Sequence, residues 1–332
     1  MVVTFPVSQA NNGLRRINPN KDYPELVELL RLVFGQEAEG EGQIFGNASG
    51  DQGPSFLWRF DPQMAKLSPG FVWEKEGKIV GNVTLLPSQP AGRYLVANVA
   101  VHPNHRRQGI ARLLMDAVVQ DVRYRRGREI LLQVVQNNQK AIGLYHSMAF
   151  ENLGSMTTWR SSVSRLRELA ENDSAVVVQS LPKNRWKEAY RLDCHALPPD
   201  LNWPAPRSAT YYKSGVLRRI VRLFSGQNSR SFVSEDDRGQ LTGLATIFSE
   251  WGRPHQIAIR IHSDWKGLLE LPLLNSVVRE VRYMPRRNVR ITHNADDETM
   301  NQLLFDVGFR RQRTLTHMRL KLNARKIDDN GE

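Results

Sequence analysis

The amino-acid sequence predicts an α/β fold with a mixed sheet, and it predicts that this fold occurs twice in tandem along the 332-residue chain. Three observations support this prediction. First, an apolar, β-rich stretch at 94–103 leads through a glycine-bearing turn into an amphipathic helical stripe. Second, another strand and helix pattern follows at 130–150. Third, parts of this arrangement recur about 160 residues further along the chain.

The elements before the glycine-bearing turn are expected in the following order. Apolar spacing predicts a first helix over 22–34. Residues 35–55 are rich in glycine and acidic side chains and lack periodicity, so a mobile loop is expected there. Residues 71–86 then predict a β-hairpin that turns at Glu76 and Gly77.

The turn itself has the features of a phosphate-binding site. It joins a strand to the N-terminus of a helix, where backbone N–H groups have no partner and the helix dipole is positive. Gly109 and Ala111 keep the side chains small where a pyrophosphate would approach the backbone. The residues expected to contact this group are Arg106, Arg107, Gln108, Gly109, Ile110, Ala111 and Arg112.

The turn also matches a known family signature. Its sequence RRQGIA fits R/Q-x-x-G-x-G/A, so this region resembles the acyl-CoA-binding loop of the GNAT superfamily of N-acetyltransferases. A second GNAT pattern, N-x-x-A-x-x-L-Y followed by G-F, is matched downstream. The matching residues are Asn138, Ala141, Leu144, Tyr145 and Phe150, with Ala149 in place of the usual glycine. We interpret Ala149 as meeting a requirement for a small residue.

The resemblance implies acetyl-CoA as the co-substrate, without a metal ion. It also implies direct attack of a primary amine on the thioester within a ternary complex. In the family, the pantetheine arm lies in a gap beside the strand that precedes the loop and bonds to exposed backbone groups. Here those groups belong to Val99, Ala100 and Val101. The amide of Val99, or of an adjacent residue, is the expected donor to the tetrahedral oxyanion.

Two side chains on the second pattern have expected roles. Tyr145 is the candidate general acid for the departing thiolate, because a phenol with a pKa of about 10 is protonated at neutral pH. The alternative is that Tyr145 only packs on an amphipathic helix. Asn138 is expected to orient the pantetheine arm, and a plain helix N-cap is the competing role.

The general base is the least defined part of the site. Many GNAT enzymes have a glutamate on the strand before the loop, but Asn98 occupies the middle of this strand and an amide is no useful proton acceptor. Glu74, on the neighbouring hairpin, is the best remaining carboxylate, and an exposed strand residue is the alternative. His102 follows the core strand and has an imidazole, a common base in enzymes, but in the family this position belongs to a loop beside the co-substrate.

The C-terminal copy lacks residues that the chemistry needs. Aligned through His262, the second loop has Leu269 where the first has Gly109, and this side chain would crowd a pyrophosphate. Leu304 stands where the first copy has Tyr145, so no phenol is available. We therefore expect a degenerate copy that supports the fold and shapes the acceptor site. The predicted boundaries are a catalytic domain at 1–160, a connector at 161–174 and the degenerate domain at 175–325.

Composition favours anionic ligands and an intracellular enzyme. The formal net charge is +12, which suits the polyanionic CoA, while basic strips interleaved with aromatic residues, as in nucleic-acid-binding proteins, are not apparent. The single cysteine, Cys194, excludes an intrachain disulfide and a cysteine-rich metal site. The absence of an apolar run of ~18 residues argues against a membrane span, and the absence of a signal-like N-terminus favours a cytoplasmic location.

The expected acceptor is a small-molecule or peptide amine. Glu37, Glu39 and Glu41 in the acidic loop would attract a cationic amine, or would simply belong to a disordered surface loop. A monomer with two pseudosymmetric copies and a homodimer both fit the sequence. The alternative to an enzyme is a non-catalytic acyl-CoA-binding sensor or scaffold, or a protein that binds nucleic acid through its basic surface.

Overall fold

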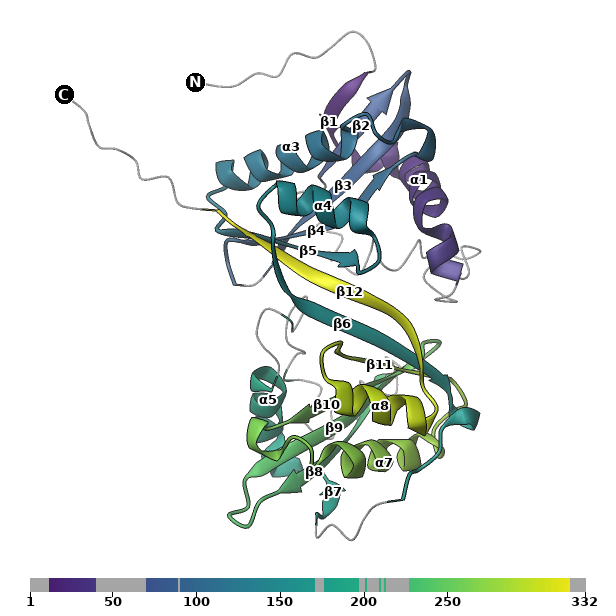
Figure 1. The fold of residues 1–332 in the computed structure, drawn as a ribbon, viewed down its shortest axis with the longest axis vertical. Helices are drawn as coiled ribbons and strands as arrows, with labels where there is room; N and C mark the ends of the chain where they lie inside the picture. The colour runs from purple at the N-terminus through teal and green to yellow at the C-terminus, as the bar shows by residue number, and fades with distance from the viewer. Residues whose placement is uncertain are drawn as a thin grey trace, which may run out of the picture. The chain divides into compact units, whose positions relative to one another are not determined.

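The computed structural model describes residues 12–39, 70–88, 90–170, 176–196 and 227–322, together with Leu201, Ala209 and Tyr212. The chain divides into two compact units, each of which gathers separate segments of sequence. The first contains Met1–Val134, Gln139–Asn152 and Met318–Glu332; the second contains Val135–Asn138 and Leu153–His317. Each unit has a sheet with helices on both faces (Figure 1).

The sheet of the first unit is mixed, as predicted. Neighbouring strands from β1 to β4 are antiparallel, and β4 is parallel to β5. Its strands in spatial order are β1 (Gly13–Arg16), β2 (Phe71–Lys75), β3 (Lys78–Ser88), β4 (Arg93–Val101), β5 (Glu129–Val135) and the end of β12 (Arg310–Lys321). The hairpin between β2 and β3 turns at Glu76 and Gly77, which have φ values of 53° and 76°, as a tight two-residue hairpin turn requires.

Helices cover both faces of this sheet. Helices α3 (Ile110–Tyr124) and α4 (Gln139–Ser147) pack on one face in the larger core, and α1 (Pro19–Glu39) packs on the other. The first helix is longer than the predicted 22–34. It begins at Pro19, a residue that suits the first helical position, and Asn18 before it accepts a hydrogen bond from Asn20 N. These two residues could have indicated the earlier start.

The acidic loop expected at 35–55 is only partly described. Residues 35–39 are the last turn of α1, which corrects the predicted start of the loop. The rest of the segment lies outside the described residues, as do the side chains of Glu37, Glu39 and Glu41. Their expected attraction for a cationic amine therefore stays a prediction.

The last strand of the chain belongs to the core of the first unit. Met318, Leu320 and Leu322 are buried in the same apolar cluster as α3 and α4, with 0%, 8% and 7% of their surfaces exposed. The amide of Leu322 also donates to Arg128 O at 2.7 Å. Segments far apart in the sequence therefore form one core, whereas the predicted domains were contiguous.

The second unit repeats the layout. Its strands in spatial order are the part of β12 up to His317, β6 (Glu151–Ser162), β11 (Asn288–Asn294), β10 (His255–Ile261), β9 (Leu241–Glu250), β8 (Gln227–Glu235) and β7 (Val178–Ser180). Strand β10 is parallel to β11 and antiparallel to β9, as β4 is to β5 and β3. Helices α7 (Glu270–Val281) and α8 (Glu298–Val307) share one core, and α5 (Trp186–His195) packs in another.

A matched pair of glycines shows how closely the two units correspond. A Cβ placed on Gly81 would lie 2.8 Å from Ile110 Cγ2, and one placed on Gly243 would lie 2.8 Å from Leu273 Cδ1. In both units a glycine on the hairpin therefore lets the following helix approach the sheet. The connector expected at 161–174 is part strand and part single turn, because Ser161 and Ser162 end β6 and Val163–Arg165 form a 3-10 turn. Its last residues, 171–174, lie outside the described part.

Candidate functional site

Strands β4 and β5 separate at the centre of the first sheet. Their parallel pairing joins residues 93–96 to 129–132 and goes no further, although β4 continues to Val101 against β3. A bulge interrupts β4, where Asn98 has a φ of 55°. The side-chain amide of Asn82 donates to Asn98 O at 2.8 Å and holds the bulge. Backbone groups of β4 beyond residue 96 are therefore not used in pairing with β5.

The residues predicted to line the pantetheine arm lie in the part of β4 that is paired with β3 but not with β5. Val99 and Val101 are partly buried and face the core that contains α3 and α4. Ala100 faces the opposite core with α1 and has only 1% of its surface exposed. The alternation leaves the backbone of all three residues along the separated edge, as the family resemblance requires.

The loop after β4 turns sharply before the helix begins. Pro103–His105 form a single 3-10 turn, and His102 Nδ1 accepts a hydrogen bond from the amide of Asn104 at 3.2 Å. Arg107 and Gly109 then both have left-handed backbone conformations, with φ values of 65° and 76°. Two such residues within three positions point successive N–H groups to one side of the loop, a concave arrangement that suits anions.

The N-terminus of α3 is open at Gly109. No side chain of the described part of the chain caps it, so the N–H groups of the first turn stay available. A Cβ placed on Gly109 would meet no atom within 4 Å, so space exists for a group lying directly on the backbone. Ile110, by contrast, is buried beneath the loop with 3% of its surface exposed and anchors the helix to the core.

Cationic side chains surround this open N-terminus. Arg106, Arg107 and Arg112 are exposed, and none of them makes an ion pair with any described residue. Arg112 donates to Ser147 Oγ on α4 at 2.5 Å, and Arg106 Nε donates to Val101 O at 3.3 Å. Their positive charges are thus free to attract a polyanion.

Tyr145 lies on α4 and points into the core that supports the loop. Only 5% of its surface is exposed, and its ring centroid is 5.8 Å from that of Phe150. Burial raises the pKa of the Tyr145 phenol to about 12, so the hydroxyl is protonated throughout the neutral range. No described residue forms a hydrogen bond with this hydroxyl, which leaves it available to an incoming group. Asn138 immediately precedes α4 and is exposed, a position that suits both roles expected for it.

Ala149 shows what the family pattern requires at the usual glycine. Its φ is 64°, and the equivalent residue of the second unit is Gly308 with a φ of 114°. The position therefore has a positive φ at the end of the helix in both units, a second reason for a glycine beside the predicted need for a small residue. An alanine there pays a backbone cost of about 1–2 kcal/mol.

Glu74 is buried in an ion-pair network, which corrects the expectation of an exposed strand residue. It has 6% of its surface exposed, and Arg15 Nε donates to its Oε2 at 2.5 Å. The same guanidinium binds both carboxylate oxygens of Asp22 on α1 at 2.6 and 2.9 Å. Burial would raise the pKa of Asp22, but hydrogen bonds from Arg15 and from the Asn18 amide outweigh it and hold that pKa below its ordinary value. A carboxylate committed to this network is better suited to structure than to accepting a proton.

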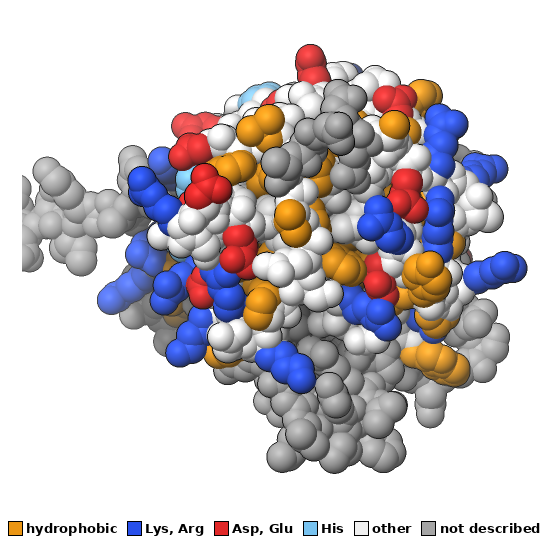
Figure 2. All heavy atoms as spheres, turned by 90° about the horizontal axis from the view of Figure 1, so that it is seen from below, with side chains coloured by type: hydrophobic (Ala, Val, Ile, Leu, Met, Phe, Trp, Pro, Cys, Tyr) orange, Lys and Arg blue, Asp and Glu red, His pale blue; other side chains and the backbone are white. Residues whose placement is uncertain are grey.

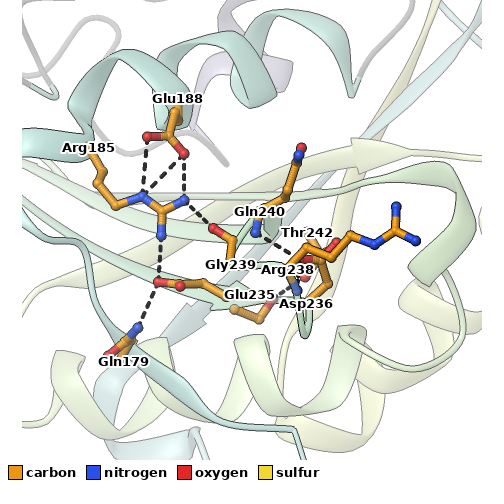
Figure 3. A network of polar contacts seen from close by, with 10 residues as sticks. Gln179, Arg185, Glu188, Glu235, Asp236, Arg238, Gly239, Gln240 and Thr242 are labelled. Carbon is orange, nitrogen blue, oxygen red and sulfur yellow. Dashed lines mark hydrogen bonds and ion pairs between the residues drawn. The ribbon is translucent and has the colours of Figure 1, made fainter.

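The second unit contains a matching network at the matching place (Figure 3). Glu235, the counterpart of Glu74, accepts from Gln179 Nε2 at 2.8 Å and pairs with Arg185 at 2.8 Å. Arg185 also binds Glu188 on α5 and the backbone oxygen of Gly239 at the tip of the hairpin. In both units the network joins the hairpin to the helix before it. Because it is also present in the unit without Tyr145, we interpret it as structural. Neither network was predictable from the sequence, because the two arginines lie in short segments without a recognisable pattern.

The second loop keeps its path but not its open end. Leu269, at the position of Gly109, has a φ of −101° and is completely buried beneath the hairpin glycine Gly243. Its side chain therefore packs in the core, which corrects the expectation that it would crowd a pyrophosphate. Leu304, at the position of Tyr145, is also completely buried in its core. Helix α7 begins at Glu270, so that Pro272 lies in its first turn, where a missing N–H is tolerated.

On the face shown in Figure 2, Lys and Arg side chains lie among acidic, apolar and neutral polar ones. In the described part of the chain, no helix is long and apolar enough to cross a membrane.

Comparison with known proteins agrees with these features. Residues 34–150, which contain the open loop, β5, α4 and Tyr145, match the model of the acetyltransferase (GNAT) family. A peptidyl-lysine N-acetyltransferase of Escherichia coli is 38% identical over 80 residues, which are 24% of this chain and 48% of that protein. N-acetyltransferase 8 of Rattus norvegicus is 35% identical over 102 residues, covering 28% of this chain and 46% of that protein. The chain thus spans about half the length of the curated relatives it matches.

Solved structures share the fold over nearly the whole chain. A GCN5-related N-acetyltransferase from Sphaerobacter thermophilus has a TM-score of 0.66 at 14% identity, covering 97% of this chain and 98% of that one. A tandem GNAT protein from the clavulanic acid biosynthesis pathway has a TM-score of 0.53 at 18% identity, covering 94% and 98%. The α/β fold with a mixed sheet, in a tandem GNAT-like layout, is therefore confirmed.

Proposed function

We propose that the first unit is an N-acetyltransferase that moves the acetyl group of acetyl-CoA to a primary amine of a small molecule or peptide. One observation carries the proposal: an uncapped helix N-terminus with open space at Gly109 lies directly after a strand that separates from its parallel neighbour. This combination offers an anion site for a pyrophosphate and, beside it, unpaired backbone for an amide-bearing arm. The family match over residues 34–150 supports the same conclusion.

The loop would hold the pyrophosphate through backbone N–H groups from Arg107 to Ala111 and through the charges of Arg106, Arg107 and Arg112. The pantetheine arm would lie along Val99, Ala100 and Val101. Its amides would complete the hydrogen bonding that β5 does not supply. Asn138 would contact the arm from the start of α4.

Acyl transfer then needs a polarised carbonyl and a proton for sulfur. The neutral amine attacks the thioester carbon, and the Val99 amide donates to the oxygen that becomes negative, an interaction typically worth about 3 kcal/mol of barrier. As the carbon–sulfur bond breaks, the Tyr145 hydroxyl donates its proton to the thiolate. The proton lost by the amine returns to the phenolate, so no net proton is consumed. Glu74 is left out of these steps because Arg15 holds its carboxylate.

Ligand-induced stabilisation tests the co-substrate. At 100 times its dissociation constant, acetyl-CoA should add about 2.7 kcal/mol to the free energy of unfolding. Gly109→Glu should abolish this effect, because it places a side chain and a negative charge where the pyrophosphate would lie. Gly252→Glu is a matched control, since Gly252 has a similar φ of 73° and also no atom within 4 Å of an added Cβ. A melting temperature unchanged by excess acetyl-CoA would contradict the proposal.

Turnover separates the enzyme from a sensor. Thiol release from acetyl-CoA is followed with a panel of amines that begins with lysine peptides, because one relative is named for peptidyl-lysine. An acceptor-dependent rate that disappears in Gly109→Glu is expected. Tight binding without turnover across the panel would instead favour the non-catalytic alternative.

A further inference from the structure

The second unit retains the backbone path of a phosphate-binding loop. Residues 263–265 form a 3-10 turn, as 103–105 do, and α7 begins 160 residues after α3. In both loops the histidine before this turn accepts a hydrogen bond from the amide two residues later, at 3.2 Å for His102 and 3.5 Å for His262. Gly267 has a φ of 88°, matching the left-handed Arg107. The two loops therefore share their backbone conformation up to Gly267, and they differ at Leu269, which lacks the positive φ of Gly109.

One amide of this loop is already bonded to a side chain of the same loop. Both carboxylate oxygens of Glu270 accept hydrogen bonds from the amide of Gly267, at 2.9 and 2.8 Å. Glu270 is the first residue of α7 and has only 4% of its surface exposed, so its charge is directed inward to the loop. The first-unit counterparts of Gly267 and Glu270 are Arg107 and the apolar Ile110. No side chain of the described residues caps α3 there.

The carboxylate has the chemistry of the ligand that is missing. A carboxylate and a phosphate oxygen both accept from backbone N–H groups at a helix N-terminus and both interact favourably with its dipole. Two negative groups cannot share this small site without repulsion. Occupation by Glu270 is therefore expected to exclude a pyrophosphate even if the backbone could adopt the required shape.

We propose that Glu270 occupies the anion site of the second loop in place of a phosphate, and that its carboxylate limits the chain to one acetyl-CoA, bound by the first unit. The stoichiometry rests on the proposed function of the first unit. The closure of the second loop does not, because it concerns the residues of that loop alone.

Inorganic pyrophosphate is the probe that tests this closure independently of acetyl transfer. The experiment uses the full-length chain with Gly109→Glu, which disables the first loop, and measures binding by calorimetry and by the shift of melting temperature. With Glu270 in place we expect neither heat nor shift. Glu270→Ala in the same background should give saturable pyrophosphate binding and a rise of melting temperature.

A second variant protects the test against misfolding. Leu269→Gly with Glu270→Ile copies the Gly109–Ile110 pair of the first unit and should bind pyrophosphate more tightly than Glu270→Ala does. Circular dichroism and a cooperative melt establish that each variant is folded. The proposal is overturned if the chain with Glu270 intact binds pyrophosphate at the second loop, or if both folded variants fail to gain binding. If the wild-type chain does not bind acetyl-CoA, the proposed function is overturned. The pyrophosphate experiment still tests whether Glu270 closes the second loop.

Discussion

The two units share their supporting structure and differ at the few positions where chemistry would occur. Both keep a hairpin glycine against the following helix, a 3-10 turn after the central strand and a left-handed residue in the loop. They part at Gly109 against Leu269, Ile110 against Glu270, and Tyr145 against Leu304. The fold tolerates these replacements, because Leu269 and Leu304 are both completely buried in the apolar core of the second unit.

The ion-pair networks teach the complementary lesson. Arg15 with Asp22 and Glu74, and Arg185 with Glu188 and Glu235, are both retained, so these charges belong to the fold rather than to the reaction. A feature present in both units is most simply structural. A feature present in one alone is the better candidate for function.

Removal of the end of β12 should have the largest effect, because it should destabilise the first unit. A chain that ends at residue 317 loses Met318, Leu320 and Leu322 from the core of the first unit. At about 2 kcal/mol or more for each buried side chain, the loss approaches the whole stability of a typical domain. We expect a first unit that no longer responds to acetyl-CoA, while a chain ending after Leu322 responds normally. Stabilisation by acetyl-CoA, measured by thermal unfolding, decides between these outcomes; an unaffected response in the shorter chain would remove β12 from the first unit.

Tyr145→Phe should affect turnover and spare binding. The hydroxyl is proposed to act only as the carbon–sulfur bond breaks, so kcat should fall while acetyl-CoA affinity stays unchanged. We expect the lower end of the range for a general acid, about 10²-fold, because a thiolate is a fair leaving group and a phenol with a pKa of about 12 is a weak acid.

The Tyr145 variant should also remain stable. Since no described residue bonds to the hydroxyl, the free energy of unfolding should change by less than about 1 kcal/mol. Steady-state kinetics beside an acetyl-CoA titration gives both quantities. Wild-type turnover by Tyr145→Phe would return this residue to a packing role and make it equivalent to Leu304.

Arg15→Met and Arg185→Met compare the two ion-pair networks directly. Asp22 and Glu74 have side chains only 1% and 8% exposed, so loss of Arg15 leaves two buried carboxylates unpaired and should cost about 2–3 kcal/mol. Glu188 and Glu235 are 44% and 24% exposed, so loss of Arg185 should cost about 1 kcal/mol or less. Denaturant unfolding measures both, and equal costs would show that burial does not distinguish the networks.

The cost of Arg15→Met should depend on pH, and that of Arg185→Met should do so less, because Arg185 lowers the pKa of Glu188, whose side chain is more exposed. The folded pKa of Asp22 is held below its ordinary value, so its contribution to stability is present above that ordinary value and is lost as pH falls through the folded pKa. The difference in unfolding free energy between wild type and Arg15→Met should therefore shrink in acid. A difference that stays constant down to pH 3 would assign the cost to lost packing instead.

The smallest expected effect is a gain of stability at Ala149. Ala149→Gly should relieve the left-handed strain of about 1–2 kcal/mol. Glycine also loses more conformational entropy on folding, so the net gain in the free energy of unfolding should be about 0.5–1 kcal/mol. The reverse change, Gly308→Ala, should destabilise by more, because its Cβ would lie 2.4 Å from Arg165 O. Thermal unfolding of the two variants gives opposite shifts if the positions are equivalent in backbone and differ in space.

Local patterns predicted much of the first unit. The hairpin turn at Glu76 and Gly77, strand β5, the helices after the loop and the α/β fold all follow from periodicity and turn chemistry that lie within a few residues. The loop geometry around Gly109 was predictable for the same reason, since a glycine at a helix start has a direct backbone consequence.

What the sequence did not predict depends on contacts between distant segments. Glu74 is separated from Arg15 by 59 residues, and nothing near either residue indicates that they meet. Glu270 is only three residues from Gly267, yet its inward direction depends on the fold of the whole loop. The place of Met318 in the first core could not be deduced, because the few apolar side chains of a strand fit either of two similar cores equally well.

The position of β12 also sets the order in which the protein can mature during its synthesis. A ribosome that has completed residue 152 must add a further 170 residues before Leu322 emerges, which takes roughly 10–30 s at ordinary rates of translation. Through that interval the nascent first unit has a gap in its core where Met318 and Leu320 will lie. A nascent chain that has not reached residue 318 therefore carries the proposed phosphate-binding loop and Tyr145 without the strand that packs in their core. The proposed catalytic unit is complete only after β12 has been synthesised.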